Sequence, residues 1–441
     1  MHFQRIRLAN WRQFSVVDIT FHRNLTIITG ANGAGKSTIL NILSQNIGQH
    51  RPYLGVPVTV NGERRFFSSV FFIPNKVVSW FKRKTDPNWS NIGAISYSNE
   101  SEAEIQVPTQ GQTEYSLQIP NQQEVAGFHM PSHRPLPRYQ QVGNITFGGL
   151  APDTSHLALS AETNHYFGGG SSGYSLLFRL KELLAGWAIF GKGNDVVGQK
   201  IEQENAYNGF NIVLKKLLPP DLGFQRLKID PPDVIFETET GDFLIDALSG
   251  GLTAIIEMAA LIYTRSLASD VIGREFVVTM DEPENHLHPA MQRTILSSLV
   301  EAFPMVQFIV ATHSPFIVTS ARNSFVYALK YESVSVVDEQ WEGAGSVRPV
   351  QPMRSRQSRR VECVFLDKGN LGIAPGEVLR EVLGVPVVLP AWAEDEIDVI
   401  VEKYRAKPFS DSTIAELRRD VNEAGLGDLF PEAVLHLGKT N

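Results

Sequence analysis

The chain has 441 residues, of which 43% are hydrophobic and 20% charged, and its formal net charge is −7 at pH 7. That composition excludes the polar, highly charged class of disordered chains, and the length predicts one large domain with an appendage, because single cores rarely grow past about 300 residues. The negative charge argues against binding nucleic acid with the whole surface, but leaves a local basic patch open. The obvious patch consists of Arg354, Arg356, Arg359 and Arg360.

Cysteine usage and the N-terminal stretch both favour a cytoplasmic protein. The single cysteine, Cys363, excludes an intramolecular disulfide framework and a zinc ribbon, which fits a reducing compartment. The first residues mix charged and apolar side chains, and no apolar run approaches the roughly 18 to 20 residues that span a bilayer. We therefore expect a cytoplasmic chain with no signal peptide and no membrane contact.

The first third of the chain reads as strands with one helix. The apolar run Leu25–Ile28 ends just before Gly30, and a helix is expected from Lys36 to about Gln45. Further strands, which predict a sheet with an antiparallel annex, are expected at 58–60, 66–73 and 92–97. Loops are predicted for the proline-rich segment 133–141 and the glycine-rich segment 168–173.

A helical stretch precedes a second set of strands. Apolar residues recur with a helical period from Ser175 to Leu218, which predicts a helical lobe at about 155–228. Strands are expected next at 234–237, 276–280 and 308–311. The last two are almost continuously apolar, as central parallel strands are.

The composition shifts to Pro, Arg, Gln and Ser from about Val347. We therefore predict a domain boundary there, with a head at 1–346 and a helical extension at 347–441. The helices of this extension are expected at 375–383, 391–404 and 413–424.

The segment Gly30–Thr38, GANGAGKST, fits the pattern G-x-x-x-x-G-K-[ST] between a predicted strand and a predicted helix. Its glycines let backbone N–H groups close around phosphates, and the start of the helix adds a positive field. Lys36 can reach the β and γ phosphates, and Ser37 can offer its hydroxyl to Mg²⁺. We predict a nucleotide phosphate site made by Asn32, Gly33, Gly35, Lys36, Ser37 and Thr38.

Two acids end the apolar strand at 276–280. Asp281 can hold Mg²⁺ directly or through water, and Glu282 can polarise an attacking water for hydrolysis. A solvated acidic strand end is the alternative, which the phosphate loop makes less attractive. The histidines that follow, His286 and His288, at first resemble metal ligands, but zinc needs an additional ligand, for which the chain offers no partner at a suitable spacing.

A second anion cradle is predicted at Leu248–Gly251, where Ser-Gly-Gly heads a predicted helix. One chain rarely needs two cradles for one phosphate, so this cradle is predicted to complete the site of a second copy, with a plain helix cap as the alternative. His313 closes the strand at 308–311 and can hydrogen-bond a γ phosphate or hold the attacking water, with a structural role as the alternative. The residues of the second cradle are Ser249, Gly250 and Gly251.

In this order, the phosphate loop, the Leu-Ser-Gly-Gly segment, the acid pair and His313 resemble the ABC-type ATPase superfamily over roughly residues 1–330. The resemblance implies an α/β fold with a parallel core sheet, an antiparallel lobe and a helical lobe, followed here by the helical extension. It implies ATP and Mg²⁺ as ligands and a homodimer or higher oligomer arranged head to tail around ATP. On this basis Glu282 and His313 are the expected catalytic residues, and Ser37 and Asp281 the expected Mg²⁺ ligands.

Three segments narrow the resemblance to a soluble branch of the superfamily. Glu284–Pro289, Ile6–Arg12 and Ala311–Pro315 look like the branch of chromosome-maintenance and repair ATPases, overcoming-lysogenization-defect nucleases and phage-defence ATPases. In particular the chain is similar to stand-alone defence ATPases encoded beside an effector, such as those of Septu and retron systems. In that branch His286 and His288 belong to a subunit-contact loop.

Some positions depart from the pattern or are assigned less directly. Leu252 replaces the polar residue that often follows Leu-Ser-Gly-Gly, and the Mg²⁺-sensing glutamine is Gln140 or Gln141. Arg12 either approaches the γ phosphate or is a surface arginine. No Asp-x-Asp pair follows His313, which argues against an autonomous metal-dependent nuclease domain.

The expected function is therefore an ATP-driven switch that controls a separately encoded effector, such as a nuclease, in anti-phage defence. The alternative is a DNA-repair or chromosome-type clamp that holds nucleic acid, although the sequence has no sustained heptads for long coiled-coil arms. A transporter ATPase is disfavoured by the Glu284–Pro289 loop. The extension is either a partner-docking module or a small helical cap.

Overall fold

The computed structural model describes residues 1–60, 63–68, 88–132, 138–145, 150–167, 170, 173–334, 358–366, 391–405, 407 and 410–438. The chain forms two compact units, Met1–Pro375 and Gly376–Asn441, and each is described by itself. No helix in these ranges has the length and apolar character needed to cross a membrane.

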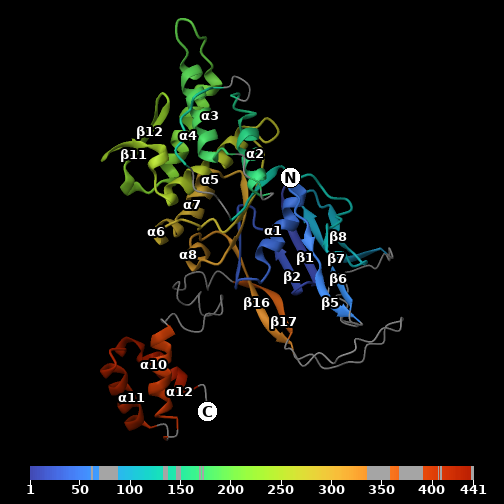
Figure 1. The fold of residues 1–441 in the computed structure, drawn as a ribbon, viewed down its shortest axis with the longest axis vertical. Coiled ribbons are helices and arrows are strands. Elements are labelled where there is room, and N and C mark those ends of the chain that lie inside the picture. The colour runs from blue at the N-terminus through green and yellow to red at the C-terminus, as the bar shows by residue number, and fades with distance from the viewer. Residues whose placement is uncertain are drawn as a thin grey trace. The chain divides into compact units, whose positions relative to one another are not determined.

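A ten-stranded sheet forms the centre of the first unit, with the strand order β10-β14-β15-β3-β16-β17-β2-β1-β7-β8 (Figure 1). The strands are β1 Phe3–Trp11, β2 Phe14–Thr20, β3 Leu25–Gly30, β7 Trp89–Tyr97, β8 Glu102–Pro108, β10 Gly127–Met130, β14 Phe276–Asp281, β15 Val306–Thr312, β16 Phe325–Val334 and β17 Ser358–Leu366. Two small ribbons lie outside it, one formed by β4 Tyr53–Leu54 and β9 Glu114–Tyr115, the other by β5 Val56–Val60 and β6 Glu63–Phe67.

One half of the sheet is parallel, from β10 through β14, β15 and β3 to β16. Its strands β3 and β15 are buried along their whole length, as apolar strands covered on both faces must be. Helix α1, Lys36–Ser44, packs on β14, β15 and β3. The parallel core predicted from the continuous apolar runs is confirmed.

The other half is antiparallel, because β2, β1, β7 and β8 pair in that sense. Its core holds large aromatic side chains, among them Trp11 and Phe14, whose rings lie 6.2 Å apart. Strand β17 joins the two halves, since it runs antiparallel to β16 and parallel to β2. The predicted antiparallel lobe is therefore present, with one central strand from beyond the predicted boundary.

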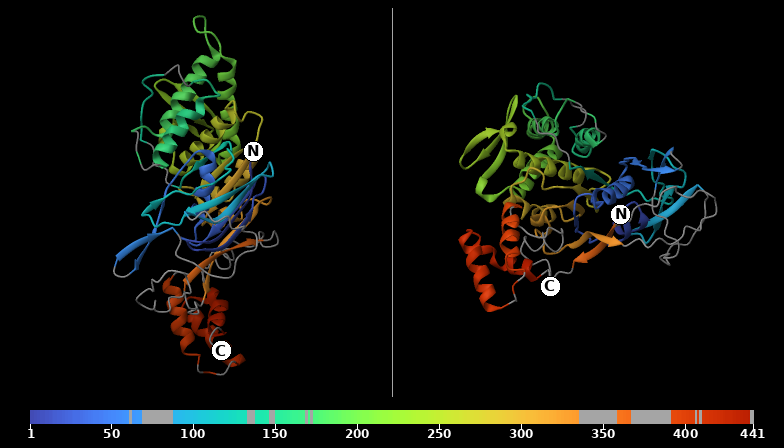
Figure 2. Two further views of the ribbon diagram at one scale, coloured as in Figure 1. Left: turned by 90° about the vertical axis from the view of Figure 1, so that its right-hand side faces the viewer. Right: turned by 60° about the horizontal axis from the view of Figure 1, so that its bottom comes forward.

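A helical lobe is built from α2 Ser155–Phe167, α3 Leu176–Lys192, α4 Ile201–Leu217 and α5 Gly250–Leu267. These helices pack on one another, and the three-stranded sheet of β11 Phe224–Asp230, β12 Asp233–Thr238 and β13 Gly241–Leu244 lies beside α3 and α4 (Figure 2). Ser175 caps α3 by accepting the Phe178 N–H. Short helices α6 Pro289–Gln292, α7 Ile295–Ala302 and α8 Pro315–Val318 follow the later core strands.

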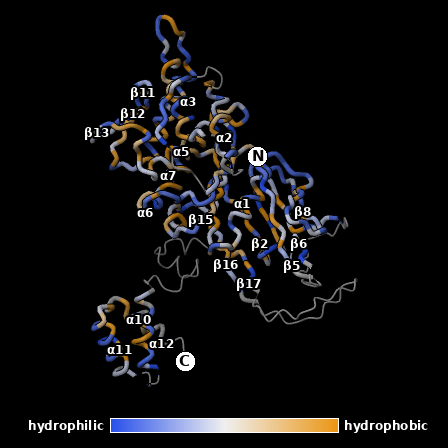
Figure 3. The backbone as a smooth tube through the Cα atoms, in the orientation of Figure 1, coloured by the Kyte–Doolittle hydropathy of each residue, from blue (hydrophilic) through white to orange (hydrophobic). Residues whose placement is uncertain are grey.

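The second unit is a small helical bundle of α10 Ala391–Glu402, α11 Asp411–Glu423 and α12 Phe430–Gly438. Apolar and polar residues alternate along these helices (Figure 3), and their apolar residues form one core that includes Ile397, Val401, Leu417 and Val421. Helices are thus present at two of the places where the sequence predicts them, 391–404 and 413–424, and the helix expected at 375–383 lies outside the described residues.

The division between the units differs from the boundary expected near Val347. That position lies outside the described residues. However, Ser358–Leu366 pairs with β16 and β2, and the chain divides into its two units after Pro375. Local composition does not indicate this strand, because its first residues, Ser358–Arg360, continue the arginine-rich composition of a linker.

Candidate functional site

The predicted motifs lie at one edge of the parallel sheet. In the register of the strands, Asp281 is opposite Ala311, and Ala311 and Thr312 are opposite Ile28 and Thr29. Since parallel strands end at the same edge, β3, β14 and β15 bring their carboxyl ends together. The site is therefore assembled from segments about 250 residues apart in sequence by strand pairing alone.

The loop between β3 and α1 has the backbone of a phosphate cradle. Gly35, the N-cap of α1, has a φ of 101° and no side chain that could cap the first N–H groups of the helix. A Cβ at Gly35 would lie 2.4 Å from the Phe14 ring, so only glycine fits there. The loop therefore offers open backbone donors at a helix start, which is a fit for phosphate oxygens.

Lys36 lies at the centre of this loop. Its Nζ donates to the carbonyl oxygens of Gly30 at 2.8 Å and Ala31 at 3.2 Å, and the residue is buried. Burial lowers the pKa of Lys36, while the nearby carboxylates of Glu282 and Asp281 act in the opposite direction. The other predicted loop residues include the exposed Asn32, Gly33 and Ser37 and the half-buried Gly35 and Thr38.

Asp281 and Ser37 form the expected donor pair for Mg²⁺. Burial raises the pKa of Asp281, which is opposed by a hydrogen bond from the Ser37 hydroxyl and by the charge of Lys36. One carboxylate oxygen, Oδ1, is buried and has no hydrogen-bond partner among the residues that the structure describes. A carboxylate with an orphaned oxygen beside a hydroxyl is a set of hard oxygen donors, and it fits Mg²⁺.

Glu282 and His313 are paired, as their positions at neighbouring strand ends suggest. His313 Nδ1 lies 3.2 Å from Glu282 Oε1, and the Asn285 amide donates to Glu282 Oε2 at 3.3 Å. Glu282 has a φ of 49°, a left-handed backbone that a side chain of this size rarely adopts. Both side chains are partly exposed, so a carboxylate oriented by two nitrogen groups reaches solvent beside the loop of Lys36.

Glu284 is a site residue that the sequence placed only in the contact loop. It is 5% exposed, and its Oε1 accepts the Thr312 hydroxyl at 2.5 Å and the His313 N–H at 3.2 Å. Its carboxylate thus joins the end of β14 to the end of β15 and fixes the backbone that carries His313. The available signal was its position two residues after Glu282, in an Asp-Glu-Pro-Glu run.

The start of α5, which carries the second predicted cradle, lies against the loop at His286. Ser249 is the exposed N-cap and accepts the Leu252 N–H at 3.5 Å, so the apolar Leu252 does not prevent capping. A Cβ at Gly251 would lie 2.9 Å from the His286 carbonyl oxygen, so the helix begins against the loop at His286. Gly250 is half-buried, and the main contacts of α5 are with α2, α3 and α4.

His286 and His288 have local roles in the turn after β14. His286 has a φ of 72°, and His288 is the N-cap of α6, where its Nδ1 accepts the Ala290 N–H at 3.3 Å. The His286 carbonyl lies against Gly251, as just described. The loop that carries the two histidines thus touches the second cradle.

A buried ion pair anchors the start of α5 from behind. Lys181 is fully buried, and its Nζ lies 2.7 Å from Asp246 Oδ2 and also donates to the Gln140 carbonyl. Asp246 belongs to the turn Ile245–Ala247, which leads directly into Ser249. A buried charge is tolerated only when it is paired and hydrogen-bonded, so this pair fixes the approach to the cradle. Nothing in the local sequence pattern marked it.

At its other end, α5 carries a second ion pair. Arg265 donates to both carboxylate oxygens of Asp270, at 2.7 and 2.6 Å. The helix is therefore held at both ends, but only the pair at its start is remote from solvent, since the Asp270 side chain is 57% exposed.

The remaining sequence candidates lie elsewhere. Arg12 donates to the Leu54 carbonyl at 3.0 Å, with its guanidinium over the Trp11 and Tyr53 rings. The Gln140 side chain donates to the Gly173 carbonyl at 3.2 Å and accepts the Ser175 N–H at 3.4 Å, so it is engaged with the helical lobe.

Two residues that the sequence did not mark contact the phosphate loop. The Gln13 amide lies 3.4 Å from the Gly33 carbonyl, and the Tyr331 hydroxyl 3.3 Å from the Asn32 carbonyl. Of the arginine cluster, Arg360 lies on β17 opposite Glu332, and Arg354 and Arg356 lie outside the described residues.

Two family models match the chain, each over about a quarter of its length. One, described as "AAA domain", matches residues 5–118. The other, described as "AAA domain, putative AbiEii toxin, Type IV TA system", matches residues 202–319. The first match contains the phosphate loop, and the second contains the cradle at Ser249, the acid pair and His313.

Three curated relatives share local sequence similarity with the chain. Retron Vc95 probable ATPase of Vibrio cholerae is 27% identical over 34% of this chain, and retron Ec83 probable ATPase of Escherichia coli is 30% identical over 24% of it. Septu protein PtuA of Bacillus thuringiensis is 27% identical over 26% of the chain. The matches span only 31%, 21% and 30% of these relatives, in the same order.

Solved structures of SMC heads align over most of the chain at low identity. The SMC head domain from Thermotoga maritima is 12% identical with a TM-score of 0.42, and covers 83% of this chain and all of that one. The SMC head with an extended coiled coil from Pyrococcus furiosus is 15% identical with a TM-score of 0.41, and covers 86% of this chain and 99% of that one.

The domain matches and the relatives agree with the geometry of the strand ends. The phosphate loop, the Asp281–Glu282 pair and His313 meet at one sheet edge, and the AAA-domain matches cover all of them. The chain is therefore similar, over these two stretches, to AAA domains and to ATPases of retron and Septu systems.

Proposed function

We propose that the chain binds ATP with Mg²⁺ and hydrolyses it. The observation that carries this proposal is the convergence of Lys36, Asp281 and the Glu282–His313 pair at one edge of the sheet. Phosphoryl transfer to water needs charge compensation at the phosphates and a base beside the water. Here Lys36, Mg²⁺ and the start of α1 would supply the charge compensation, and the Glu282 carboxylate would act as the base.

Each side chain would have a separate task in the reaction. Lys36 would exchange its carbonyl partners for phosphate oxygens, and Ser37 and Asp281 would hold Mg²⁺, which supplies charge neutralisation between the phosphates. Glu282 would accept a proton from the attacking water. His313, 3.2 Å from Glu282 Oε1, would orient that carboxylate or donate to the γ phosphate.

We further propose that a second copy completes the site. Ser249 is exposed, Gly251 allows close backbone approach, and α5 is long enough to present a positive N-terminal field. Its main contacts are with α2, α3 and α4, so an anion at this cradle would come from outside the chain. A head-to-tail dimer or higher oligomer would place the cradle on ATP bound by the partner copy.

The biological role that we propose is control of a separately encoded effector in anti-phage defence, in the cytoplasm. Relatives named as retron ATPases and a Septu protein support it by association, although the chain matches less than a third of each. An effector such as a nuclease would sense whether the dimer holds ATP. A clamp that grips DNA is the alternative, and it predicts ATP-dependent binding of duplex DNA.

The decisive experiment compares the parent with Glu282→Gln and with the surface control Glu301→Gln. We expect Glu282→Gln to bind ATP, to lose at least about 100-fold in turnover because it lacks the base, and to accumulate as a dimer in ATP by light scattering. Glu301, exposed on α7, should behave as the parent does. Equal turnover in the parent and Glu282→Gln would refute the role of Glu282.

The effector and clamp hypotheses separate in the same preparations. The ATP-trapped Glu282→Gln dimer is tested for binding to the product of a neighbouring gene and to duplex DNA. Retention of the neighbouring protein without DNA supports effector control, whereas ATP-dependent DNA binding alone supports the clamp.

A further inference from the structure

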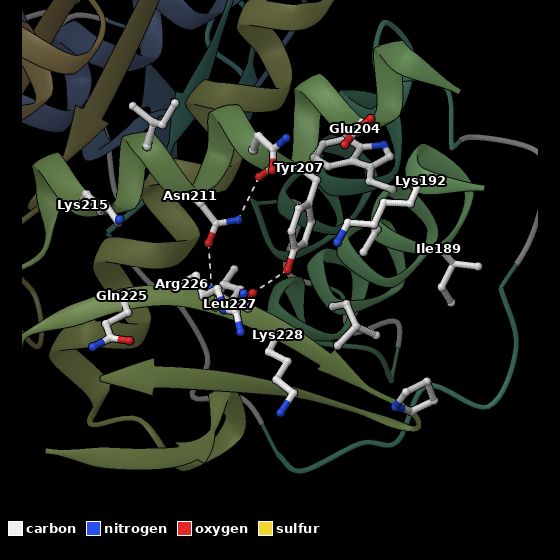
Figure 4. Close-up of a pocket in the computed structure, with 16 residues that line it drawn as sticks. Ile189, Lys192, Glu204, Tyr207, Asn211, Lys215, Gln225, Arg226, Leu227 and Lys228 are labelled. Carbon is white, nitrogen blue, oxygen red and sulfur yellow. Dashed lines mark hydrogen bonds between the residues drawn. The ribbon is translucent and has the colours of Figure 1, made fainter. Parts of the chain in front are cut away.

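A groove with a volume of about 610 Å³ lies on the helical lobe (Figure 4). The end of α3, the outer face of α4 and the strand β11 form its walls. None of the phosphate-loop, acid-pair or cradle residues lines it, so it is distinct from the proposed ATP site.

The floor of the groove is fixed by hydrogen bonds between α4 and β11. The Tyr207 hydroxyl donates to the Leu227 carbonyl at 2.5 Å, and the Leu227 N–H donates to Asn211 Oδ1 at 2.7 Å (Figure 4). β11 is an edge strand of its sheet, and these bonds occupy its backbone groups at the midpoint. A ligand therefore cannot add a continuous strand here, and must be held by side chains.

The groove is positively charged on a chain with a net charge of −7. Lys192 and Lys215 end α3 and α4, and no ion pair of either is found within the described ranges. The other two cations, Arg226 and Lys228, share the carboxylate of Glu237, at 2.5 and 3.7 Å. With Glu204 as the one acid in the lining, four cations face two carboxylates, and the excess charge favours an acidic ligand.

The apolar part of the lining selects among acidic ligands. Ile189 and Ile212, 38% and 60% exposed, supply aliphatic surface. The aromatic lining offers no free ring face, because Trp187 is fully buried and the Tyr207 ring is fixed through its hydroxyl. Binding of single-stranded nucleic acid relies on exposed rings that stack with bases. The combination therefore favours a peptide with carboxylates and aliphatic side chains over a nucleic acid.

We propose that this groove docks an acidic, aliphatic segment of a partner protein. The inference rests on the proposed control of an effector for its biological meaning, and it names the surface and chemistry of that contact. Such a segment would place carboxylates on Lys192 and Lys215 and apolar side chains against Ile189 and Ile212.

The test uses a displayed library of random twelve-residue peptides, selected on the full-length parent. We expect enrichment of sequences rich in Asp or Glu together with Leu, Ile or Val. Their affinity should fall at least about tenfold on the variant Lys192→Glu/Lys215→Glu, because two favourable charge contacts become repulsive. The control Lys200→Glu/Lys216→Glu makes the same change of net charge at two exposed positions outside the groove, the N-cap of α4 and its last turn, and should bind as the parent does.

Three outcomes would overturn the proposal. The first is selection of peptides without an acidic excess, and the second is an equal loss of peptide affinity in the groove and control variants. The third is binding of a single-stranded oligonucleotide that depends on Lys192 and Lys215 when binding of the peptides does not. Thermal unfolding of each variant checks that the exposed substitutions leave the fold intact. A parent that binds the selected peptides but does not hydrolyse ATP would refute the proposed function and leave the groove assignment standing.

Discussion

We propose anion cradles at the phosphate-loop edge and at the start of α5, and the two places are built in different ways. At the sheet edge, strand register brings Lys36, Asp281, Glu282 and His313 together within one chain. At α5, Ser249 is exposed and is supported from behind by Lys181 and Asp246. The first place assembles its proposed chemistry within one chain, and the second is an exposed helix start held by a buried anchor, which suits the shared site that we propose.

The largest expected effect, on ATP binding and turnover at the phosphate-loop edge, comes from changing Lys36. Lys36→Ala removes the positive charge at the centre of the loop. That charge then no longer offsets the negative charges of Asp281, Glu282 and the phosphates. We expect ATP binding by calorimetry and turnover to fall by at least about 100-fold. The matched control is Lys330→Ala on β16, which should retain both. Normal ATP binding by Lys36→Ala would remove this edge from consideration as the nucleotide site.

Mixing two inactive variants tests whether the regions meet between copies. Lys36→Ala disables the loop, and Ser249→Arg should block the cradle with a bulky side chain. In a head-to-tail dimer that exchanges subunits, a mixed dimer has one doubly damaged site and one intact site, so an equal mixture should recover about a quarter of parent turnover. If the mixture is as inactive as either variant, the cradle acts within its own chain or not at all.

A smaller effect is expected from the anchor behind the cradle. Lys181→Met leaves the Asp246 carboxylate buried without a partner, which should lower the free energy of unfolding by about 3 to 5 kcal/mol. Because the Asp246 turn leads into Ser249, ATP-dependent dimerisation should weaken as well. Urea unfolding and light scattering measure the two effects.

Arg265→Met serves as the control at the other end of α5. Asp270 is solvated there, so stability should fall by only about 1 kcal/mol or less and dimerisation should not change. Equal dimerisation by the Lys181 and Arg265 variants would mean that the buried pair stabilises the fold without positioning the cradle. The variant Lys181→Arg, which keeps a cation, should restore part of the dimerisation.

The last effect appears only at acid pH and concerns His129, beside the sheet edge. His129 donates or accepts at Nδ1 with the Thr279 hydroxyl at 2.9 Å, two residues before Asp281, and burial lowers the pKa of His129 to about 4. Because the folded state disfavours protonated His129, the free energy of unfolding has its full value above the unfolded-state pKa near 6.5. It falls as the pH is lowered toward 4. The loss should reach about 3 kcal/mol at pH 4.

Urea titrations of the parent and His129→Asn between pH 7 and 4 measure this loss. The variant should lack this part of the pH dependence, because asparagine cannot take up a proton in this range. An unchanged slope in the variant would assign the acid sensitivity to other groups.

The sequence predicted those features that depend on local pattern. Continuous apolar runs identified β14 and β15, and the glycine-lysine pattern of residues 30–38 identified the loop. Knowing that parallel strands end at one edge was enough to expect Asp281 and His313 beside Lys36. The AAA-domain matches cover these same segments.

Features that depend on long-range contacts could not be predicted. Glu284 and Lys181 look like ordinary charged residues, and only the folded chain shows that each is buried and paired with a distant group. The bonds of Gln140, one of the two candidates for the Mg²⁺-sensing glutamine, to Gly173 and Ser175 are likewise long-range contacts that no local pattern indicates. Strand β17 was missed because it begins in an arginine-rich stretch and its pairing partners, β16 and β2, are not encoded near it in sequence.

The position of β17 has a consequence for how the protein is made. Its residues, Ser358–Leu366, lie between β16 and β2, so a strand from late in the chain fills the middle of a sheet that begins at residue 3. During synthesis, β2 has no β17 to pair with until more than 360 residues have left the ribosome. Until then β2 has an unpaired edge, and a chaperone that shields strand edges would act in this interval.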